Sequence, residues 1–206
     1  MASKQRSKAP VLWVVAGPNG SGKSSLYSDI GAEAFDRSVW IINPDLLTER
    51  IQLVEGLSIR EANIEAVVRV EAWLEASIRA YQTIGVETVL STDKYRRLVL
   101  IAKQQQFEFR LTYIILQSPD LNVERVCLRV KKGGHSVDEL KIRERWAKSL
   151  GQLPWFLDRA DWAAIYDNSA EKPRRVAFKE DGTIYLDSAA PAAIRAAVEA
   201  AGASRP

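Results

Sequence analysis

The residues best suited to chemistry lie near the start of the chain, at positions 17–24. They match the pattern G-x-x-x-x-G-K-[ST] and read Gly17-Pro18-Asn19-Gly20-Ser21-Gly22-Lys23-Ser24. Glycines let successive backbone N–H groups face an anion, the lysine reaches the terminal phosphates of a nucleotide, and the serine hydroxyl ligates Mg²⁺. These residues and the adjoining Ser25 therefore predict a binding site for ATP and Mg²⁺.

The sequence around this loop has the order of elements that phosphate binding requires. Val11 to Ala16 form a short apolar run bounded by Pro10 and Gly17, which is typical of a strand buried on both faces of a parallel sheet. A helix is expected directly after the loop, and its N-terminus adds partial positive charge there. This context favours a phosphate site over a glycine-rich turn without function.

A phosphate loop alone does not define a reaction. Transporter-type ATPases also carry such a loop, but they need a glycine-rich signature and an apolar strand that ends in a carboxylate pair. Here the apolar residues 111–116 continue into Gln117-Ser118-Pro119, and the chain has no Asn-Lys-x-Asp guanine reader. A small-molecule kinase is the preferred interpretation, and a nucleotide-gated binding module or simple ATPase is the alternative.

Two carboxylates are the acidic candidates for the site. Asp45 follows an apolar strand at residues 39–42, where a carboxylate would face the acceptor hydroxyl as a base or organise Mg²⁺. An N-cap before the next helix is its alternative role. Glu87 lies inside the apolar run 86–90, and a buried carboxylate requires a partner such as a metal, a substrate hydroxyl or a lysine. Its alternative is a strand-edge residue that reaches solvent.

A basic segment interrupted by Gly133-Gly134 has the composition of a kinase lid. Arginines that fold over a nucleotide stabilise the charge on the transferred group, and glycines permit closure. Arg129 and Arg145 flank the glycines and are the candidates for phosphate contact. A solvated helix face is expected for Lys132, Lys141 and Arg143, and a structural turn for His135.

The last apolar strand, at residues 163–166, ends in Asp167-Asn168-Ser169. Asn168 would lie where the adenine of a nucleotide is held, and the alternative is a plain turn before Pro173. The one cysteine, Cys127, lies in a helical pattern and is expected to be a small buried residue.

Composition agrees with one folded domain. The chain has 206 residues, of which 47% are hydrophobic and 27% charged, with a net charge of +3. This charge is too weak to indicate a nucleic acid partner. Residues 1–10 are expected to be a disordered basic tail and residues 11–206 a single P-loop kinase domain. The apolar run 11–16 is too short for a signal or a membrane span, so a cytoplasmic protein without membrane attachment is expected.

The apolar runs alternate with helical patterns, as in residues 59–83, and predict an α/β fold with a parallel sheet flanked by helices on both faces. Near the end, two strand patterns flank Glu180-Asp181-Gly182 and predict a C-terminal hairpin. Pro191 then opens an alanine-rich helix.

Taken in order, the motifs between residues 12 and 169 resemble the zeta-toxin family. Beyond the phosphate loop, the resemblance rests on several short motifs and three longer ones. The short motifs are Arg129-Val130, Gly133-Gly134-His135-Ser136-Val137, Ile142 with Arg145, and Ser149-Leu150. The longer motifs are Ile42-Asn43-Pro44-Asp45, Glu87-Thr88-Val89-Leu90-Ser91-Thr92-Asp93-Lys94-Tyr95 and Tyr166-Asp167-Asn168-Ser169.

This resemblance implies a P-loop kinase, because the founding toxins phosphorylate the 3′-hydroxyl of UDP-N-acetylglucosamine. By that similarity Lys23 and Ser24 hold ATP-Mg²⁺, and Asp45 matches the aspartate taken as the base. Arg129 and Arg145 are similar to lid arginines, and Glu87 to a strand glutamate near the acceptor. The resemblance also implies a small-molecule acceptor and a neutralising antitoxin protein as partners.

Overall fold

The computed structural model describes residues 9–29, 39–134 and 136–203. Within these ranges seven strands form one sheet in the order β2-β3-β1-β4-β5-β6-β7. The first five strands in that order run parallel, whereas β6 and β7 are antiparallel to their neighbours. The strands are β1 (Val11–Ala16), β2 (Ile41–Ile42), β3 (Ile84–Thr88), β4 (Glu108–Ile115), β5 (Trp162–Asp167), β6 (Arg174–Glu180) and β7 (Thr183–Leu186).

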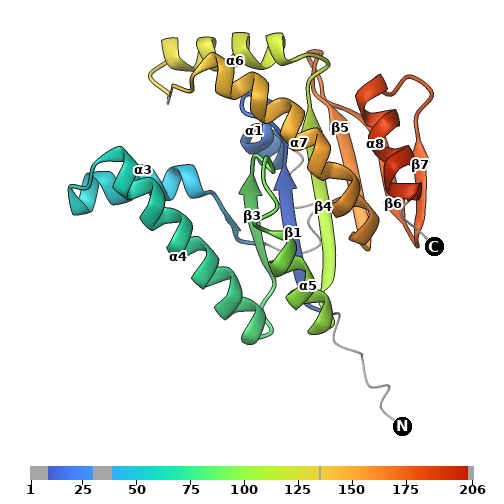
Figure 1. The fold of residues 1–206 in the computed structure, drawn as a ribbon, viewed down its shortest axis with the longest axis horizontal. Coiled ribbons are helices and arrows are strands. Elements are labelled where there is room, and N and C mark those ends of the chain that lie inside the picture. The colour runs from blue at the N-terminus through green and yellow to red at the C-terminus, as the bar shows by residue number, and fades with distance from the viewer. Residues whose placement is uncertain (1–8, 30–38, 135, 204–206) are drawn as a thin grey trace.

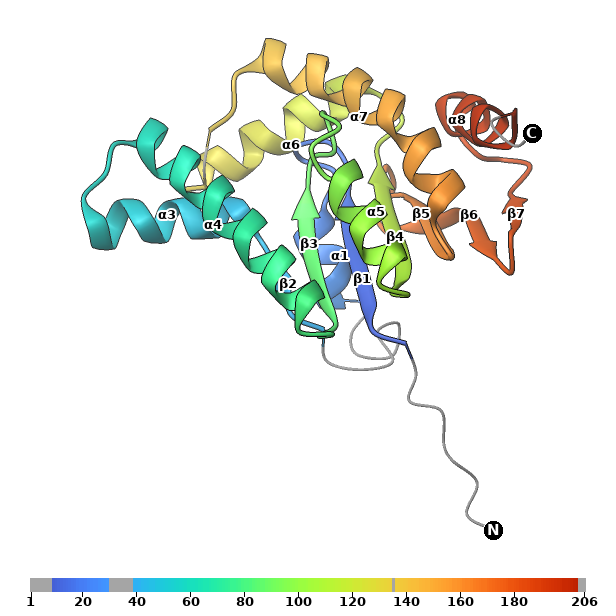
Figure 2. The ribbon, with the colours of Figure 1, turned by 60° about the horizontal axis from the view of Figure 1, so that its bottom comes forward.

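Helices lie on both faces of this sheet (Figures 1 and 2). The short helix α1 lies on one face, and α5 and α7 cover the other, while α3 and α4 form an arm beside β3. The helices are α1 (Lys23–Asp29), α3 (Pro44–Glu55), α4 (Ile59–Arg79), α5 (Arg96–Gln104), α6 (Pro119–Lys131), α7 (Glu139–Arg159) and α8 (Ala192–Ala203). The predicted α/β fold with a parallel sheet and a C-terminal hairpin is confirmed.

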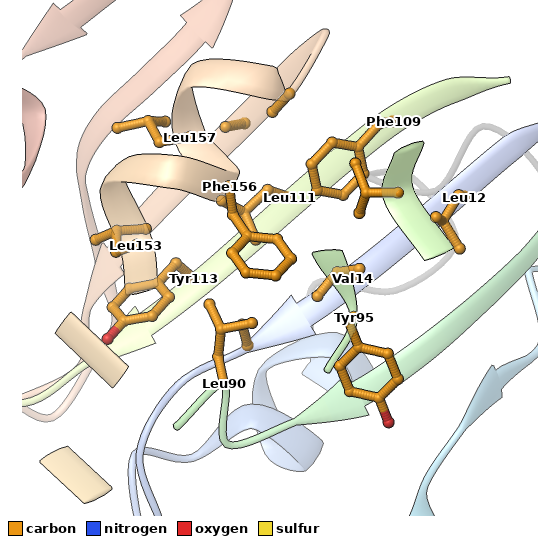
Figure 3. Packing of buried hydrophobic residues seen from close by; sticks show 14 of the residues in the cluster. Leu12, Val14, Leu90, Tyr95, Phe109, Leu111, Tyr113, Leu153, Phe156 and Leu157 are labelled. Atoms are coloured by element: carbon orange, nitrogen blue, oxygen red, sulfur yellow. The ribbon is translucent and has the colours of Figure 1, made fainter. Parts of the chain in front are cut away.

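The main core lies between the sheet and helices α4, α5, α7 and α8. Strand residues such as Leu12, Val14 and Leu111 share this cluster with Leu153 and Phe156 of α7, and all of them are buried (Figure 3). A smaller cluster on the opposite face joins Trp13 and Val15 of β1 to Leu26 of α1. Side chains of a strand alternate between the two faces of the sheet, and both faces of β1 are covered by apolar clusters. Every position of β1 is therefore apolar, which explains the continuous run in its sequence.

Parallel strands direct their carboxyl ends to one edge of the sheet, and this edge positions the site. The phosphate loop follows β1 at this edge, and β2 and β3 on the same side of β1 also end there. Helix α6 and the first turns of α7 lie over the ends of β1 and β3 (Figure 1). Residues far apart in the sequence are therefore brought together above β1.

Two local expectations require correction. Cys127 is exposed on α6 and is not buried, because the buried face of that helix is formed by Asn122 and Val126. Strand β2 is limited to two residues, where four were expected. His135 and the greater part of the expected basic tail lie outside the described residues. Among the described helices, none combines the length and the apolar character that crossing a membrane requires.

Candidate phosphotransfer site

The phosphate loop packs so closely against its surroundings that its glycines are required. Gly17, Gly20 and Gly22 have φ values of +148°, +76° and +89°, a region that other residues adopt with strain. A Cβ atom on Gly17 would lie 2.1 Å from the carbonyl oxygen of Ile114, and one on Gly22 would lie 2.4 Å from Nδ2 of Asn168. The loop is therefore a narrow backbone cradle at the start of α1, which suits a phosphate group.

Lys23 points back into this loop. Its Nζ donates hydrogen bonds to the carbonyl oxygens of Gly17 at 2.8 Å and Pro18 at 3.1 Å, and lies 4.0 Å from Oε1 of Glu87. Burial lowers the pKa of Lys23, while the nearby carboxylates of Glu87 and Asp45 act in the opposite direction. The ammonium group thus stands at the loop, where phosphate oxygens would replace the two carbonyls as acceptors.

Glu87 receives hydrogen bonds from two other parts of the chain. The Ser24 hydroxyl donates to its Oε2 at 2.9 Å, and Nδ2 of Asn43 donates to the same oxygen at 3.0 Å. Only 8% of Glu87 is exposed, which excludes the alternative of a strand-edge residue that reaches solvent. The partner that a buried carboxylate requires is therefore a set of donors from the loop, the start of α3 and Lys23.

Asp45 lies in the first turn of α3 but is not its N-cap, so the capping role considered for it is wrong. Asn43 is the cap, and its Oδ1 accepts hydrogen bonds from the N–H groups of Asp45 at 2.9 Å and Leu46 at 3.4 Å. Pro44 takes the first helical position, where its missing N–H costs nothing. The carboxylate of Asp45 is not used by the cap and lines two cavities beside the loop.

Three cavities meet at Lys23 and Glu87, which line all of them. The largest, of about 650 Å³, extends over the phosphate loop to Ser25 and Asn168, and we call it the nucleotide cavity. The other two, of about 460 and 340 Å³, share Asn43, Asp45 and Arg145, and we call them the acceptor cavities. A group held at Lys23 would therefore border the nucleotide cavity and the acceptor cavities together.

The two arginines expected in a lid both reach these cavities. Arg129, in the last turn of α6, lines the nucleotide cavity and the larger acceptor cavity. Arg145 on α7 lines both acceptor cavities, and its Nη1 lies 3.4 Å from Oδ1 of Asn19 in the phosphate loop. In contrast, Arg143 forms ion pairs with Asp120 and Glu139, away from the cavities.

Lys132 and Lys141 differ from the expectation of a plain solvated face. Both are exposed, but Lys132 lines the nucleotide cavity and Lys141 the larger acceptor cavity. They flank the turn between α6 and α7, and the larger acceptor cavity is also lined by the described turn residues Gly134, Ser136, Val137 and Asp138. These lysines line the cavities because the turn lies over the edge of the sheet. Helical spacing in the sequence could not predict that position.

Asn168 closes the nucleotide cavity from the end of β5. Its Nδ2 donates to the backbone carbonyl of Ser21 at 2.9 Å, and Nη2 of Arg125 donates to the carbonyl of Asn168 at 2.7 Å. The segment is a turn as well, because the N–H of Ser169 donates to Oδ1 of Asp167 at 3.0 Å. The turn and the contact with the phosphate loop therefore coexist.

Three residues of the site carried no assigned role in the sequence. Asn43 had a local signal, since Asn before Pro and an acidic residue is typical of a helix start. Arg125 belongs to the basic segment expected to form a lid, but the sequence indicated no particular contact for it, and Asn122 had no signal. Nδ2 of Asn122 donates to the carbonyl oxygen of Asn19 at 2.6 Å and ties α6 to the phosphate loop. Only the packing of α6 over the loop brings this buried amide to its partner.

The donor set also suits a hard divalent cation. The Ser24 hydroxyl and the carboxylates of Asp45 and Glu87 line the larger acceptor cavity together. Over the part of the chain that the structure describes, no group of three or more His, Cys, Asp or Glu side chains could hold a metal unaided. Mg²⁺ in nucleotide sites is held by one or two carboxylates together with phosphates and water, and these residues fit that pattern.

The sheet order, the phosphate loop after β1 and the helices on both faces define a P-loop kinase fold. A family model for zeta toxins matches residues 1–149, more than half of the chain. The chain therefore belongs to the zeta toxin family. Membership of this family on this fold makes the protein a phosphotransferase.

Individual proteins are similar to this chain in sequence or in fold. An uncharacterized protein of Haemophilus influenzae is 28% identical over 142 residues, covering 66% of this chain and 96% of that protein. A structure of the PezAT toxin-antitoxin system of Streptococcus pneumoniae has a TM-score of 0.64 at 18% identity, over 92% of this chain and 76% of that one. The AvrRxo1-ORF1:-ORF2 complex with ATP has a TM-score of 0.67 at 14% identity, over 96% of this chain but only 65% of that one.

Proposed function

We propose that this protein transfers the γ-phosphate of ATP to a hydroxyl of a small-molecule acceptor, a nucleotide sugar such as UDP-N-acetylglucosamine or a related metabolite. The observation that carries the proposal is the meeting of the nucleotide cavity and the acceptor cavities at Lys23 and Glu87. Phosphoryl transfer needs a donor and an acceptor in line on opposite sides of the transferred group. Neighbouring cavities that share Lys23 and Glu87 would bring the donor and the acceptor to the same point.

In the nucleotide cavity, the backbone N–H groups of the phosphate loop hold the phosphates of ATP. Lys23 leaves the carbonyl oxygens of Gly17 and Pro18 and donates to the terminal phosphates instead. This exchange is favourable because a charged acceptor forms the stronger hydrogen bond. Asn168, which the loop already contacts through Ser21, borders the base. The AvrRxo1-ORF1:-ORF2 complex, one of the structural relatives, holds ATP, which supports this choice of nucleotide.

Ser24 and Asp45 are the proposed ligands of Mg²⁺. When bound, the cation would neutralise charge on the phosphates and hold them in line with the acceptor. Asp45 has a second proposed role as the base that accepts the proton of the attacking hydroxyl. Its position at the start of α3, in both acceptor cavities, supports this second role.

Arg129 and Arg145 act on the group in transfer. Each guanidinium lines a cavity that Lys23 also lines, and positive charge at this point stabilises the transition state more than bound ATP. Glu87 faces the acceptor cavities as well, where its carboxylate orients Ser24 and the acceptor hydroxyl.

A neutralising protein partner belongs to the same proposal. It is supported by the PezAT toxin-antitoxin system among the structural relatives. A kinase that removes a cell-wall precursor from use would harm its own cell, so an antitoxin that blocks either cavity would be required. Growth arrest on expression, relieved by the product of an adjacent gene, is the expected behaviour.

The deciding experiment incubates the pure protein with γ-labelled ATP, Mg²⁺ and a panel of nucleotide sugars, nucleosides and dinucleotides. Transfer of label to one acceptor class, absent in a Lys23→Ala variant, is the expected result. If no acceptor changes ATP turnover while ATP alters association with another macromolecule, the protein is a nucleotide-gated binding module and the proposal is wrong.

A further inference from the structure

The side chain of Asn43 uses both ends of its amide, and the two ends contact different parts of the site. Its Oδ1 caps α3 by accepting hydrogen bonds from the N–H groups of Asp45 and Leu46. Its Nδ2 donates to Oε2 of Glu87 at 3.0 Å. A single side chain therefore connects the first turn of α3 to the end of β3.

Few side chains can make these two contacts at once. An N-cap needs an oxygen that accepts from the backbone, and Asn, Asp, Ser and Thr all supply one. The contact with a carboxylate needs a donor on the opposite side of the same group. Asn has both on a planar amide, whereas ionised Asp of the same shape has acceptors only. The Asn43 amide therefore supplies both the donor that Glu87 accepts and the acceptor that the first N–H groups of α3 require.

The arm formed by α3 and α4 makes this contact important. The arm lies beside the sheet (Figure 2). Its outer part has a small core of its own, formed by Ile51, Ala62 and Ala66, whereas the second half of α4 packs into the main core. The end of the arm nearest the phosphate loop carries Asp45. The proposed function requires the carboxylate of Asp45 to keep a fixed position relative to that loop. The hydrogen bond from Asn43 to Glu87 ties that end to the sheet.

From this geometry we infer that Asn43 is a positioning residue, which holds Asp45 in its place relative to Glu87 and the transferred phosphate. The inference rests on the proposed function, in which Asp45 acts on the acceptor side. Asn43 lines both acceptor cavities and does not line the nucleotide cavity. Its loss should therefore lower kcat and leave ATP affinity unchanged.

A pair of isosteric substitutions tests the contact. Asn43→Asp keeps the capping oxygen but removes the donor and sets a second carboxylate against Glu87. Glu87→Gln keeps an acceptor for Asn43. In the double variant, the new Gln amide can donate to the new Asp carboxylate, so the hydrogen bond is restored with reversed polarity. We expect Asn43→Asp to lower kcat about tenfold or more in the native background, and by less than about threefold in the Glu87→Gln background.

The same four proteins are compared by thermal unfolding without nucleotide. Asn43→Asp should lower the midpoint temperature of unfolding in the native background and leave it unchanged in the Glu87→Gln background. Equal losses in both backgrounds would show that Asn43 acts without Glu87 and would overturn the inference. This measurement needs no acceptor, so a failure to find phosphoryl transfer would end the proposed function without deciding the role of Asn43.

Ser58→Ala is the matched control for loss of a helix cap. Ser58 caps α4 and exchanges hydrogen bonds with Glu61 in a capping box, on the same arm but outside the three cavities. Its removal should lower the unfolding midpoint and leave kcat unchanged. If Ser58→Ala lowers kcat as much as Asn43→Asp, or if Asn43→Asp weakens ATP binding as much as it lowers kcat, the positioning role is refuted.

Discussion

The hydroxyl of Ser24 donates a hydrogen bond of 2.9 Å to Oε2 of Glu87, which links the first turn of α1 to the end of β3. A hydroxyl that gives its proton to a carboxylate keeps its oxygen lone pairs directed elsewhere. Ser24 is therefore oriented as a ligand for a cation, with Glu87 as the group behind it. This relationship connects the strand glutamate to the proposed metal site without requiring that Glu87 itself ligate the metal.

Lys23→Ala should abolish turnover and weaken ATP binding about tenfold to a hundredfold, the loss expected for charged hydrogen bonds to the terminal phosphates. The backbone N–H groups of the loop remain, so some affinity persists. Calorimetric titration with ATP measures the change. Lys148→Ala, which removes an exposed lysine paired with Glu144 on α7, serves as the control. Native affinity in Lys23→Ala would refute the assignment of the loop.

Asp45→Asn retains the shape of the side chain and removes the proton acceptor. ATP affinity should stay within about twofold, and turnover should fall by roughly two to four orders of magnitude, the range for loss of a general base. Because Asp45 is also a proposed metal ligand, the Mg²⁺ concentration at half-maximal rate should rise. Steady-state kinetics over a range of Mg²⁺ measures both effects.

Asp181→Asn is the control for this substitution. Asp181 lies in the hairpin turn between β6 and β7 with a φ of +48°, a conformation that Asn adopts readily. It should leave turnover and the Mg²⁺ dependence unchanged. A loss of ATP binding in Asp45→Asn that matches the loss of turnover would restrict Asp45 to metal binding.

Arg129→Ala and Arg145→Ala should each lower kcat about tenfold to a hundredfold, because each removes a charged donor that acts mainly in the closed, reacting state. Arg143→Ala should have little effect on kcat, since that side chain pairs with Asp120 and Glu139. Single-turnover rates separate these variants. Equal damage from Arg143→Ala would mean that the opposite face of α7 contacts the phosphates.

Gly17→Ala should destabilise the protein by more than about 2 kcal/mol, because the added Cβ meets the carbonyl oxygen of Ile114 at 2.1 Å and the backbone has a positive φ. Gly151→Ala is the opposite case. Gly151 lies inside α7 with nothing near its absent Cβ, so alanine should stabilise by about 0.5–1 kcal/mol. Urea unfolding measures both, and a neutral Gly17→Ala would contradict the close packing of the loop.

The class of fold and the position of the phosphate loop were determined by the sequence alone. Their signals are local. A strand buried on both faces is apolar throughout, and a loop that cradles phosphate needs glycines, lysine and serine at set spacings. The hairpin at Asp181-Gly182 was predictable for the same reason, because both residues adopt positive φ in the turn.

Only the tertiary structure decided which side chains meet. Asn122 contacts Asn19 across 103 positions, and Asn168 contacts Ser21 across 147. Neither pairing follows from spacing, because both depend on how α6 and β5 pack around β1. Likewise, the cap of α3 is Asn43 and not Asp45, which leaves Asp45 facing the acceptor cavities. Local pattern determines which elements form, whereas packing at the sheet edge determines which of their polar groups share a site.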